Sequence, residues 1–251
     1  MESKKYRFGP VVFAFVTEIP MHTVDMYEKF RTDDCAAADY TVEIIPLPET
    51  SPCGVRESVQ TRVQGDRILT AMNRDVIPNL SVGRLMYLID AAGLFLQKDS
   101  FVLHASYIIR NGKALLFSAP SGTGKSTQAD LWHTCRGCEI VNGDRVIISR
   151  EDGLFLANGA YVAGSSGICK NRTAPLDSIV LLEQAPQCAV KTIPVAKKLE
   201  RLLCQCSFHP EDSQQYSKMM DLISDLLQTV PVFCYGCTKD AEAVEILEKY
   251  L

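Results

Sequence analysis

The feature that most constrains the fold of this 251-residue chain is a short glycine-containing stretch near its middle. An apolar run typical of a buried strand, Leu115-Leu116-Phe117, leads into the loop Ser118-Ala119-Pro120-Ser121-Gly122-Thr123-Gly124, and a helix is predicted to begin at Lys125. Glycine has no Cβ, so Gly122 and Gly124 allow several backbone N–H groups to point at one place. The helix N-terminus adds a dipole that favours anions. This order of elements predicts a phosphate-binding loop.

The residues of this loop have the chemistry that bound polyphosphate needs. Lys125 supplies a cation that reaches the β- and γ-phosphates, and the Ser126 hydroxyl is placed to hold a bridging Mg²⁺ ion. We therefore expect a nucleotide to be bound by seven consecutive residues, namely Ser121, Gly122, Thr123, Gly124, Lys125, Ser126 and Thr127. Ala119 replaces the first glycine of the usual motif, which costs some backbone freedom. The alternative is an ordinary glycine-rich turn with a surface lysine.

One acidic residue further along the chain is a candidate second ligand for the metal ion. Strands are predicted at 139–141 and 145–149, and they place Asp144 at a strand end near the mouth of the loop. Mg²⁺ keeps most of its waters, so one carboxylate opposite Ser126 is sufficient. The alternative is that Asp144 is only a turn residue. A second loop of small residues, 161–167, is predicted either to contact phosphate or acceptor or to be a plain surface loop.

Composition restricts the possible partners. The chain is 47% hydrophobic and 22% charged with a net charge of -4, so it lacks the basic excess of nucleic-acid-binding proteins. It has no run of 18 apolar residues, and its N-terminus, Met-Glu-Ser-Lys-Lys-Tyr, lacks an apolar h-region. We therefore expect neither a membrane span nor a signal peptide, and a cytoplasmic location.

The cysteines offer a second metal-binding hypothesis. Among ten cysteines, Cys135 with Cys138 and Cys234 with Cys237 have the spacing of zinc ligands. The two pairs lie far apart in the sequence, and Cys234 belongs to an apolar run. Buried packing of these thiols is therefore the favoured interpretation, and a shared zinc site is the alternative.

Secondary-structure patterns divide the chain into a β-rich first part and an α/β second part. Strands are predicted at 6–17, 40–46, 57–63 and 66–72, the last two joined as a hairpin at Gly65-Asp66, and a helix from Ser81 to Leu96 follows. Further strands are predicted at 101–109, 113–118, 178–182 and 231–235, with helices over 195–206, 216–230 and 243–250. Asn111-Gly112 joins the two strands before the loop as an antiparallel hairpin, unlike an all-parallel Rossmann-like sheet.

Taken together, these motifs resemble a known family. Leu103-His104-Ala105-Ser106, the hairpin, the loop 118–127 and Asn142-Gly143-Asp144-Arg145 are similar to the catalytic domain of HPr kinase/phosphorylase and its serine-kinase relatives. More distantly, they resemble ATP-dependent phosphoenolpyruvate carboxykinase. The resemblance covers residues 99–251 and implies an α/β fold of the P-loop kinase type, with a mixed sheet and flanking helices. Residues 1–98 would be a smaller β-rich region, hypothetically for substrate recognition.

The resemblance implies an ATP- and Mg²⁺-dependent kinase that transfers a γ-phosphoryl group to a hydroxyl of a protein, a peptide or a small metabolite. Lys125 would stabilise the transferred group, Ser126 and Asp144 would hold the metal, and His104 would lie beside the γ-phosphate or the acceptor. The relatives have two adjacent aspartates where this chain has Gly143 and Asp144, so the general base is not assigned. His104 is the nearest candidate for it, and a purely structural histidine is the alternative.

Two other functions remain open at this stage. A carboxykinase-like enzyme would need an additional metal site built from histidine or lysine, and the chain has only four histidines. A nucleotide-sensing module would bind ATP without transferring phosphate, which the loss of the paired acid favours. The sequence does not identify the acceptor, and it is compatible with a homo-oligomer.

Overall fold

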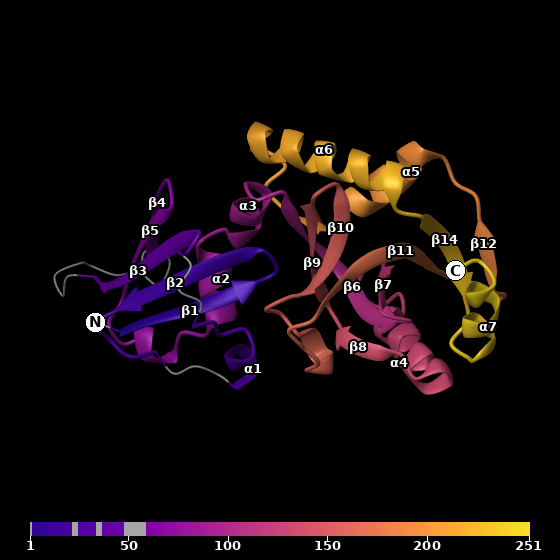
Figure 1. Cartoon of the computed structure of the whole chain (residues 1–251), viewed down its shortest axis with the longest axis horizontal. Helices are drawn as coiled ribbons and strands as arrows, with labels where there is room; N and C mark the ends of the chain where they lie inside the picture. The colour runs from indigo at the N-terminus through magenta and orange to yellow at the C-terminus, as the bar shows by residue number, and fades with distance from the viewer. Residues whose placement is uncertain (1, 22–24, 34–36, 48–58) are drawn as a thin grey trace. The chain divides into compact units, whose positions relative to one another are not determined.

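The computed structural model describes residues 2–21, 25–33, 37–47 and 59–251. The chain divides into two compact units, Met1–Ala91 and Ala92–Leu251, each with its own β-sheet (Figure 1). The sequence patterns placed the division between residues 98 and 99.

The first unit is built on a five-stranded sheet in the order β1-β2-β3-β5-β4. Its strands are β1 (Glu2–Phe8), β2 (Val11–Thr17), β3 (Tyr40–Pro46), β4 (Val59–Gln64) and β5 (Arg67–Met72). Its helical segments are α1 (Asp25–Glu28), η1 (Ile77–Asn79) and α2 (Val82–Leu88). Buried aromatic rings on β1 and β2, including Tyr6, Phe8 and Phe13, form much of its core.

Two predicted elements of this part of the chain are wrong. The single strand expected over 6–17 is a hairpin of β1 and β2, because Gly9 has a φ of 58° and starts a tight turn with Pro10. The single helix expected from Ser81 to Leu96 is two helices, α2 and α3 (Ala91–Leu96), because Asp90 adopts a left-handed φ of 50° between them. Ser81 does cap α2, since its side chain accepts from the N–H of Arg84.

The second unit is built on a nine-stranded mixed sheet in the order β10-β9-β6-β7-β11-β14-β12, with β8 and β13 paired to β6. Its strands are β6 (Ser100–Arg110), β7 (Lys113–Ser118), β8 (Glu139–Asn142), β9 (Arg145–Glu151), β10 (Leu154–Gly159), β11 (Thr173–Gln184), β12 (Ala189–Lys191), β13 (Cys206–Ser207) and β14 (Val232–Cys237). Strand β11 pairs in parallel with both β7 and β14, whereas the other strand pairs of this sheet are antiparallel. The unit is therefore a mixed α/β fold, as the sequence predicted.

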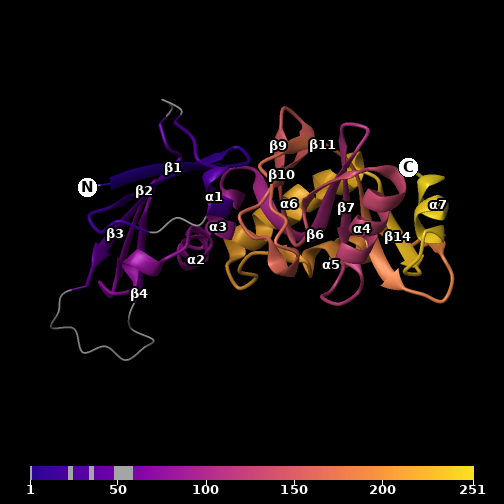
Figure 2. The same ribbon diagram turned by 90° about the horizontal axis from the view of Figure 1, so that it is seen from below.

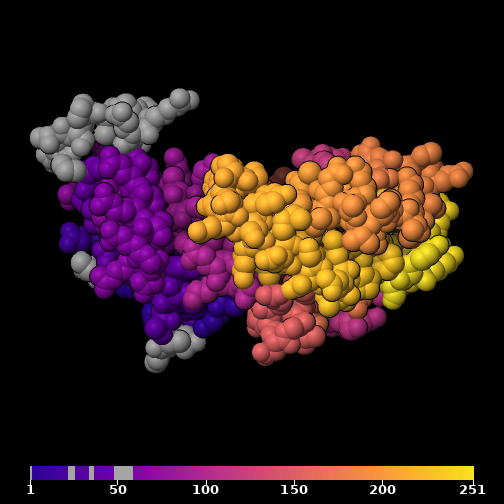
Figure 3. Space-filling model, turned by 90° about the horizontal axis from the view of Figure 1, so that it is seen from above, coloured from indigo at the N-terminus to yellow at the C-terminus, as the bar shows by residue number. Residues whose placement is uncertain are grey.

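Helices cover both faces of this sheet. They are α4 (Lys125–Arg136), α5 (Val195–Leu203), α6 (Ser213–Thr229) and α7 (Glu242–Glu248), with a short turn η2 (Gly164–Ser166). Leu202, Met219 and Leu222 belong to the core of one face, and Trp132 and Leu247 to the core of the other. In the view of Figure 2, α4 lies in front of the sheet and α5 and α6 lie behind it. The outward sides of α5 and α6 form a continuous surface in Figure 3.

Strand β6 joins the two halves of this sheet. Its first residues, Ser100 to His104, pair with β9, and its last residues, Ala105 to Arg110, pair with β7. The predicted hairpin between β6 and β7 is confirmed, with Asn111 at a φ of 51° and Gly112 at 78°. None of the helices in the described residues is long and apolar enough to cross a membrane.

Candidate nucleotide and metal site

The glycine-containing loop leaves the end of β7 and enters the first turn of α4. Gly122 has a φ of 79° and Gly124 a φ of 119°, in the left-handed region that favours glycine. A Cβ at either position would meet nothing within 4 Å, so the backbone angles, and not a lack of space, call for glycine here. The side chain of Gln184, at the end of β11, donates to the Gly122 carbonyl at 3.1 Å. The first amides of α4 have no carbonyl partner within the helix and are free to bind an anion.

Lys125 is a buried cation inside this loop. The residue is only 7% exposed, and its Nζ donates to the carbonyls of Ala119 at 2.9 Å and Pro120 at 3.3 Å. Lys125 forms no ion pair with any other described residue. Burial lowers the pKa of Lys125, while the charge of Asp144 acts in the opposite direction. Because a buried charge without a counter-ion is costly, an anion bound next to this ammonium would be stabilised.

The other predicted loop residues differ in their accessibility. Ser121, Gly122 and Ser126 are exposed, whereas Thr123, Gly124 and Thr127 are half-buried. The Ser126 hydroxyl is therefore accessible to a ligand from the first turn of α4.

A cavity of about 410 Å³ lies beside the loop. One wall comes from Thr123, Gly124, Thr127 and Gln128, and the other from Gln184–Pro186 and Cys237–Lys239 at the ends of β11 and β14. This volume lies within the usual range for small-molecule sites. Gln128 is buried, and its Nε2 donates to the Thr238 carbonyl at 3.1 Å, but its Oε1 has no hydrogen-bond partner. The Gln128 Oε1 is therefore a buried acceptor without a donor, which is energetically costly.

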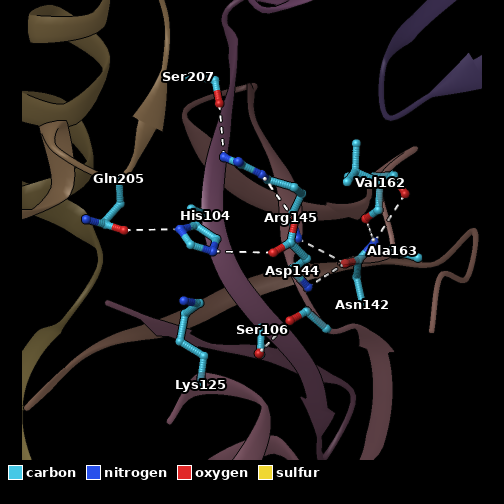
Figure 4. Close-up of polar contacts among 12 residues, drawn as sticks. His104, Ser106, Lys125, Asn142, Asp144, Arg145, Val162, Ala163, Gln205 and Ser207 are labelled. Carbon is cyan, nitrogen blue, oxygen red and sulfur yellow. Dashed lines mark hydrogen bonds and ion pairs between the residues drawn. The ribbon is translucent and has the colours of Figure 1, made fainter. Parts of the chain in front are cut away.

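The acidic end of the site is fixed by the buried Asn142. Its Oδ1 accepts from the N–H groups of Asp144 at 2.8 Å and Arg145 at 3.0 Å. Its Nδ2 donates to the carbonyls of Ala160 at 3.2 Å and Val162 at 2.9 Å, as Figure 4 shows for the Val162 side of the site. Asn142 therefore ties the turn that carries Asp144 to the second loop of small residues.

A chain of polar contacts runs through Asp144 (Figure 4). The Nδ1 of His104 lies 3.2 Å from Gln205 Oε1, and its Nε2 lies 3.3 Å from Asp144 Oδ1. On the other side, Asp144 Oδ2 lies 3.3 Å from Arg145 Nε, and Arg145 Nη1 donates to the Ser207 hydroxyl at 3.2 Å. The hydrogen bond from His104 and the nearby cations lower the pKa of Asp144, although burial opposes this. Asp144 is therefore held as a carboxylate.

The three predicted catalytic residues lie near one another. His104 contacts Asp144 directly, and Lys125 interacts electrostatically with Asp144. Both ring nitrogens of His104 have partners, so in this arrangement His104 orients the carboxylate. This geometry does not present a free imidazole nitrogen to an acceptor, and the role of His104 as a base stays a prediction.

The position just before Asp144 has no room for a side chain. A Cβ on Gly143 would lie 2.2 Å from the Oγ and 2.8 Å from the Cβ of Ser166 in η2. Gly164, at the start of η2, has a φ of 59°, and a Cβ there would lie 2.6 Å from the Cβ and 3.1 Å from the Oδ1 of Asp144. The turn η2 is therefore packed closely on the Gly143–Asp144 segment.

Several residues of the site have no local signal in the sequence. Gln205 holds the His104 ring and also accepts the His104 N–H on its backbone carbonyl at 2.8 Å, yet it belongs to a segment that reads as the end of a helix. The β14 wall of the cavity is brought to the loop by the tertiary fold. Asn142 and Arg145 do flank the predicted acid, and a buried Asn before a turn is the one clue that could have indicated the Asx turn.

The described cysteines are free thiols. Within the described ranges, no group of three His, Cys, Asp or Glu side chains is arranged to hold a metal ion. Cys138 and Cys237 are buried in the core that contains Trp132, and Cys234 contacts Arg201 at 3.0 Å. A Mg²⁺ ion held by one carboxylate, a hydroxyl and phosphate oxygens would not form such a group.

Comparison with known proteins gives little further information. No family model matches the sequence, and no curated protein matches it. Among solved structures, the Hpr(Ser) kinase/phosphatase from Coxiella burnetii matches 59% of this chain and 94% of that chain, with 13% sequence identity and a TM-score of 0.34. A match at this level does not support a common function, so the functional argument rests on the geometry of the site.

Proposed function

We propose that this protein is an ATP- and Mg²⁺-dependent phosphotransferase that moves the γ-phosphoryl group to a hydroxyl of a protein, a peptide or a small metabolite. The observation that carries the proposal is the Lys125 ammonium, which is buried in a loop of positive-φ glycines and has no ion pair in the described part of the chain. A phosphate chain would supply the counter-ion, and the accessible first-turn amides of α4 would share its charge.

The donor set around Asp144 is suitable for Mg²⁺. The ion prefers oxygen ligands, and the exposed Ser126 hydroxyl and the ionised Asp144 carboxylate are the residues that would hold it. Each carboxylate oxygen has lone pairs beyond the single contact it makes with His104 or Arg145. When bound, Mg²⁺ neutralises charge on the β- and γ-phosphate oxygens.

The remaining residues would act by position and charge. Lys125 would stabilise the charge on the γ-phosphoryl group during its transfer, because phosphoryl transfer depends mainly on alignment and charge neutralisation. His104 would keep Asp144 in one orientation through the contact at 3.3 Å. The 410 Å³ cavity would take the nucleoside.

A nucleotide sensor is the second candidate, and the packing of Ser166 against Gly143 favours it because no second acid can occupy that place. A loose phosphoryl-transfer transition state needs little help from a base, so this loss alone does not favour the sensor over the kinase. A carboxykinase-like reaction would need a further metal site, and His104 is already engaged with Gln205 and Asp144.

The test is nucleotide binding by calorimetry on the full chain, with Lys125→Ala and Lys113→Ala as a matched pair. Lys113 lies at the opposite end of β7, is exposed and pairs with Asp177 at 3.0 Å. We expect Lys125→Ala to weaken Mg²⁺-ATP binding by at least about tenfold, a loss of about 1.4 kcal/mol, and Lys113→Ala to leave it unchanged. Unchanged affinity in Lys125→Ala would refute the phosphate-binding assignment. ATP consumption is then measured in the wild type: turnover supports the kinase, and binding without turnover supports the sensor.

A further inference from the structure

The turn η2 brings a serine hydroxyl close to the proposed metal-binding acid. Gly164 is in contact with the Asp144 side chain, since even a methyl group at Gly164 would overlap it. Consecutive Cα atoms are about 3.8 Å apart, so the next residue, Ser165, carries its hydroxyl within roughly 10 Å of the Asp144 carboxylate. Asp144 in turn interacts with the Lys125 ammonium, where the γ-phosphate would lie.

Ser165 carries a hydroxyl that is not engaged and that lies outside the proposed phosphate-binding loop. Its side chain is exposed and makes no hydrogen bond to any residue that the structure describes. Four other serine hydroxyls near this acid each have a partner, namely those of Ser106, Ser118, Ser166 and Ser207. The Ser126 hydroxyl belongs to the phosphate-binding loop itself. Ser106 and Ser118 are also fully buried.

Glycines on both sides of Ser165 give the backbone of the turn conformational freedom. Gly164 and Gly167 bracket it at φ values of 59° and 65°. A Cβ at Gly167 would meet nothing within 4 Å, so this end of the turn is not packed against other residues. Glycine reaches many backbone conformations, so a short movement of the turn would carry Ser165 toward the phosphate site.

We propose that Ser165 is a phosphoryl acceptor of the chain's own active site, so that the protein phosphorylates itself on η2. This inference rests on the proposed kinase function and names one of its acceptors. The Ser165 Oγ forms a bond to the γ-phosphorus while the bond from that phosphorus to the β–γ bridging oxygen breaks. ADP leaves with the electron pair, the hydroxyl proton passes to water, and the products are phosphoserine and ADP.

Modification would change the packing of η2. Phosphoserine carries a charge of about -1.5 to -2 at neutral pH, and the Asp144 carboxylate lies against the preceding residue. Repulsion between these two negative groups favours release of the turn from the acid. We therefore expect the reaction to stop at one phosphate on η2.

The experiment measures the intact mass of the full-length protein after incubation with Mg²⁺ and ATP, followed by fragmentation to locate the phosphate. We expect one phosphoryl group per chain on Ser165, its loss in Ser165→Ala and in Lys125→Ala, and its retention in Ser165→Thr, which keeps a hydroxyl. The fraction of chains phosphorylated per unit time should not depend on protein concentration, because each chain would modify itself. A rate proportional to protein concentration, or phosphate on another residue in the wild type, would overturn the proposal.

Failure of this inference can be separated from failure of the proposed function. If the wild type binds and consumes Mg²⁺-ATP but Ser165 gains no phosphate, the self-acceptor is refuted and the phosphotransferase stands. If the wild type does not bind Mg²⁺-ATP, both are refuted. Calorimetry on Ser165→Ala provides the control, and we expect its nucleotide affinity to equal that of the wild type.

Discussion

Replacing Gly143 by alanine tests the packing of η2 on the acidic turn. The new methyl group would lie 2.2 Å from Ser166 Oγ and 2.8 Å from Ser166 Cβ, so Ser166 has to move. Movement breaks the bond from its hydroxyl to the Ala163 carbonyl, at 2.9 Å, and the bond from the Ile168 N–H, at 3.2 Å. The Gly143 backbone lies outside the left-handed region, so steric overlap is the dominant cost.

The size of the effect follows from these contacts. Overpacking a close-packed site costs about 1–3 kcal/mol, and a lost hydrogen bond costs about 1 kcal/mol. We expect Gly143→Ala to lower the free energy of unfolding by about 1–3 kcal/mol. Ser166→Gly alone loses the two hydrogen bonds and should cost about 1–2 kcal/mol. Ser166→Gly also removes the atoms that the Gly143→Ala methyl group would overlap. The double variant should therefore lose about 1–2 kcal/mol less unfolding free energy than the two single losses added together.

Trp132 makes this measurement specific to the second unit. It is the single tryptophan of the sequence, it is fully buried in α4, and its ring centroid lies 6.4 Å from that of Phe117. Urea titrations followed by its fluorescence report the unfolding of the unit that contains the site. Gly112→Ala combined with Ser166→Gly is the control pair, since nothing lies within 4 Å of a Cβ at Gly112, and its effects should add. Additivity within about 0.5 kcal/mol for Gly143→Ala and Ser166→Gly would refute the packing argument.

Three further predictions concern charged groups. Asp144→Asn should raise the Mg²⁺ concentration needed for half-maximal ATP turnover, and an unchanged Mg²⁺ dependence would exclude Asp144 as a ligand. His104→Ala should raise the same concentration while leaving nucleotide affinity unchanged, because His104 orients Asp144; calorimetry and turnover measured together test this. The pKa of Asp99 is lowered, chiefly by its hydrogen bond from Lys218 and also by Arg150. Its stabilising effect is therefore present above the ordinary carboxyl pKa and is lost as pH falls through the lowered one. Asp99 is exposed enough for solvent screening, so Asp99→Asn should reduce stability at pH 7 by less than about 1 kcal/mol, and in urea titrations this difference should shrink as pH falls through the lowered pKa.

Elements with a local cause could be predicted from the sequence. Asn111-Gly112 sets the hairpin of β6 and β7 through its own backbone preferences, and the apolar stripe of α6 sets its buried face. The two errors also have local causes. The run of β-branched and aromatic residues over 6–17 conceals the turn at Gly9, and the apolar spacing after Ser81 continues across the left-handed Asp90.

The residues of the site also divide into those that local sequence reveals and those that only the tertiary fold brings together. The loop residues are contiguous, so the order of strand, glycines, lysine and hydroxyl could be recognised directly. Gln205 is 101 positions from His104 and reaches it through the pairing of β13 with β6, which periodicity does not reveal. The tight contacts of η2 with Gly143 and Asp144 depend on tertiary packing. The sequence shows a glycine before Asp144, and the structure adds that Ser166 occupies the space that a side chain at Gly143 would need.

The central position of β6 has a consequence for the timescales on which the site moves. Leu103 pairs with both β9 and β13, and Tyr107 pairs with both β7 and β8, so this strand has neighbours on both edges in each half. Exchange of its amide hydrogens therefore requires opening of the whole unit, and these amides should be among the slowest to exchange. Exposed turns such as η2 exchange through small local openings. We therefore expect the strand that carries His104 to exchange its amide hydrogens more slowly than η2, which lies against Asp144.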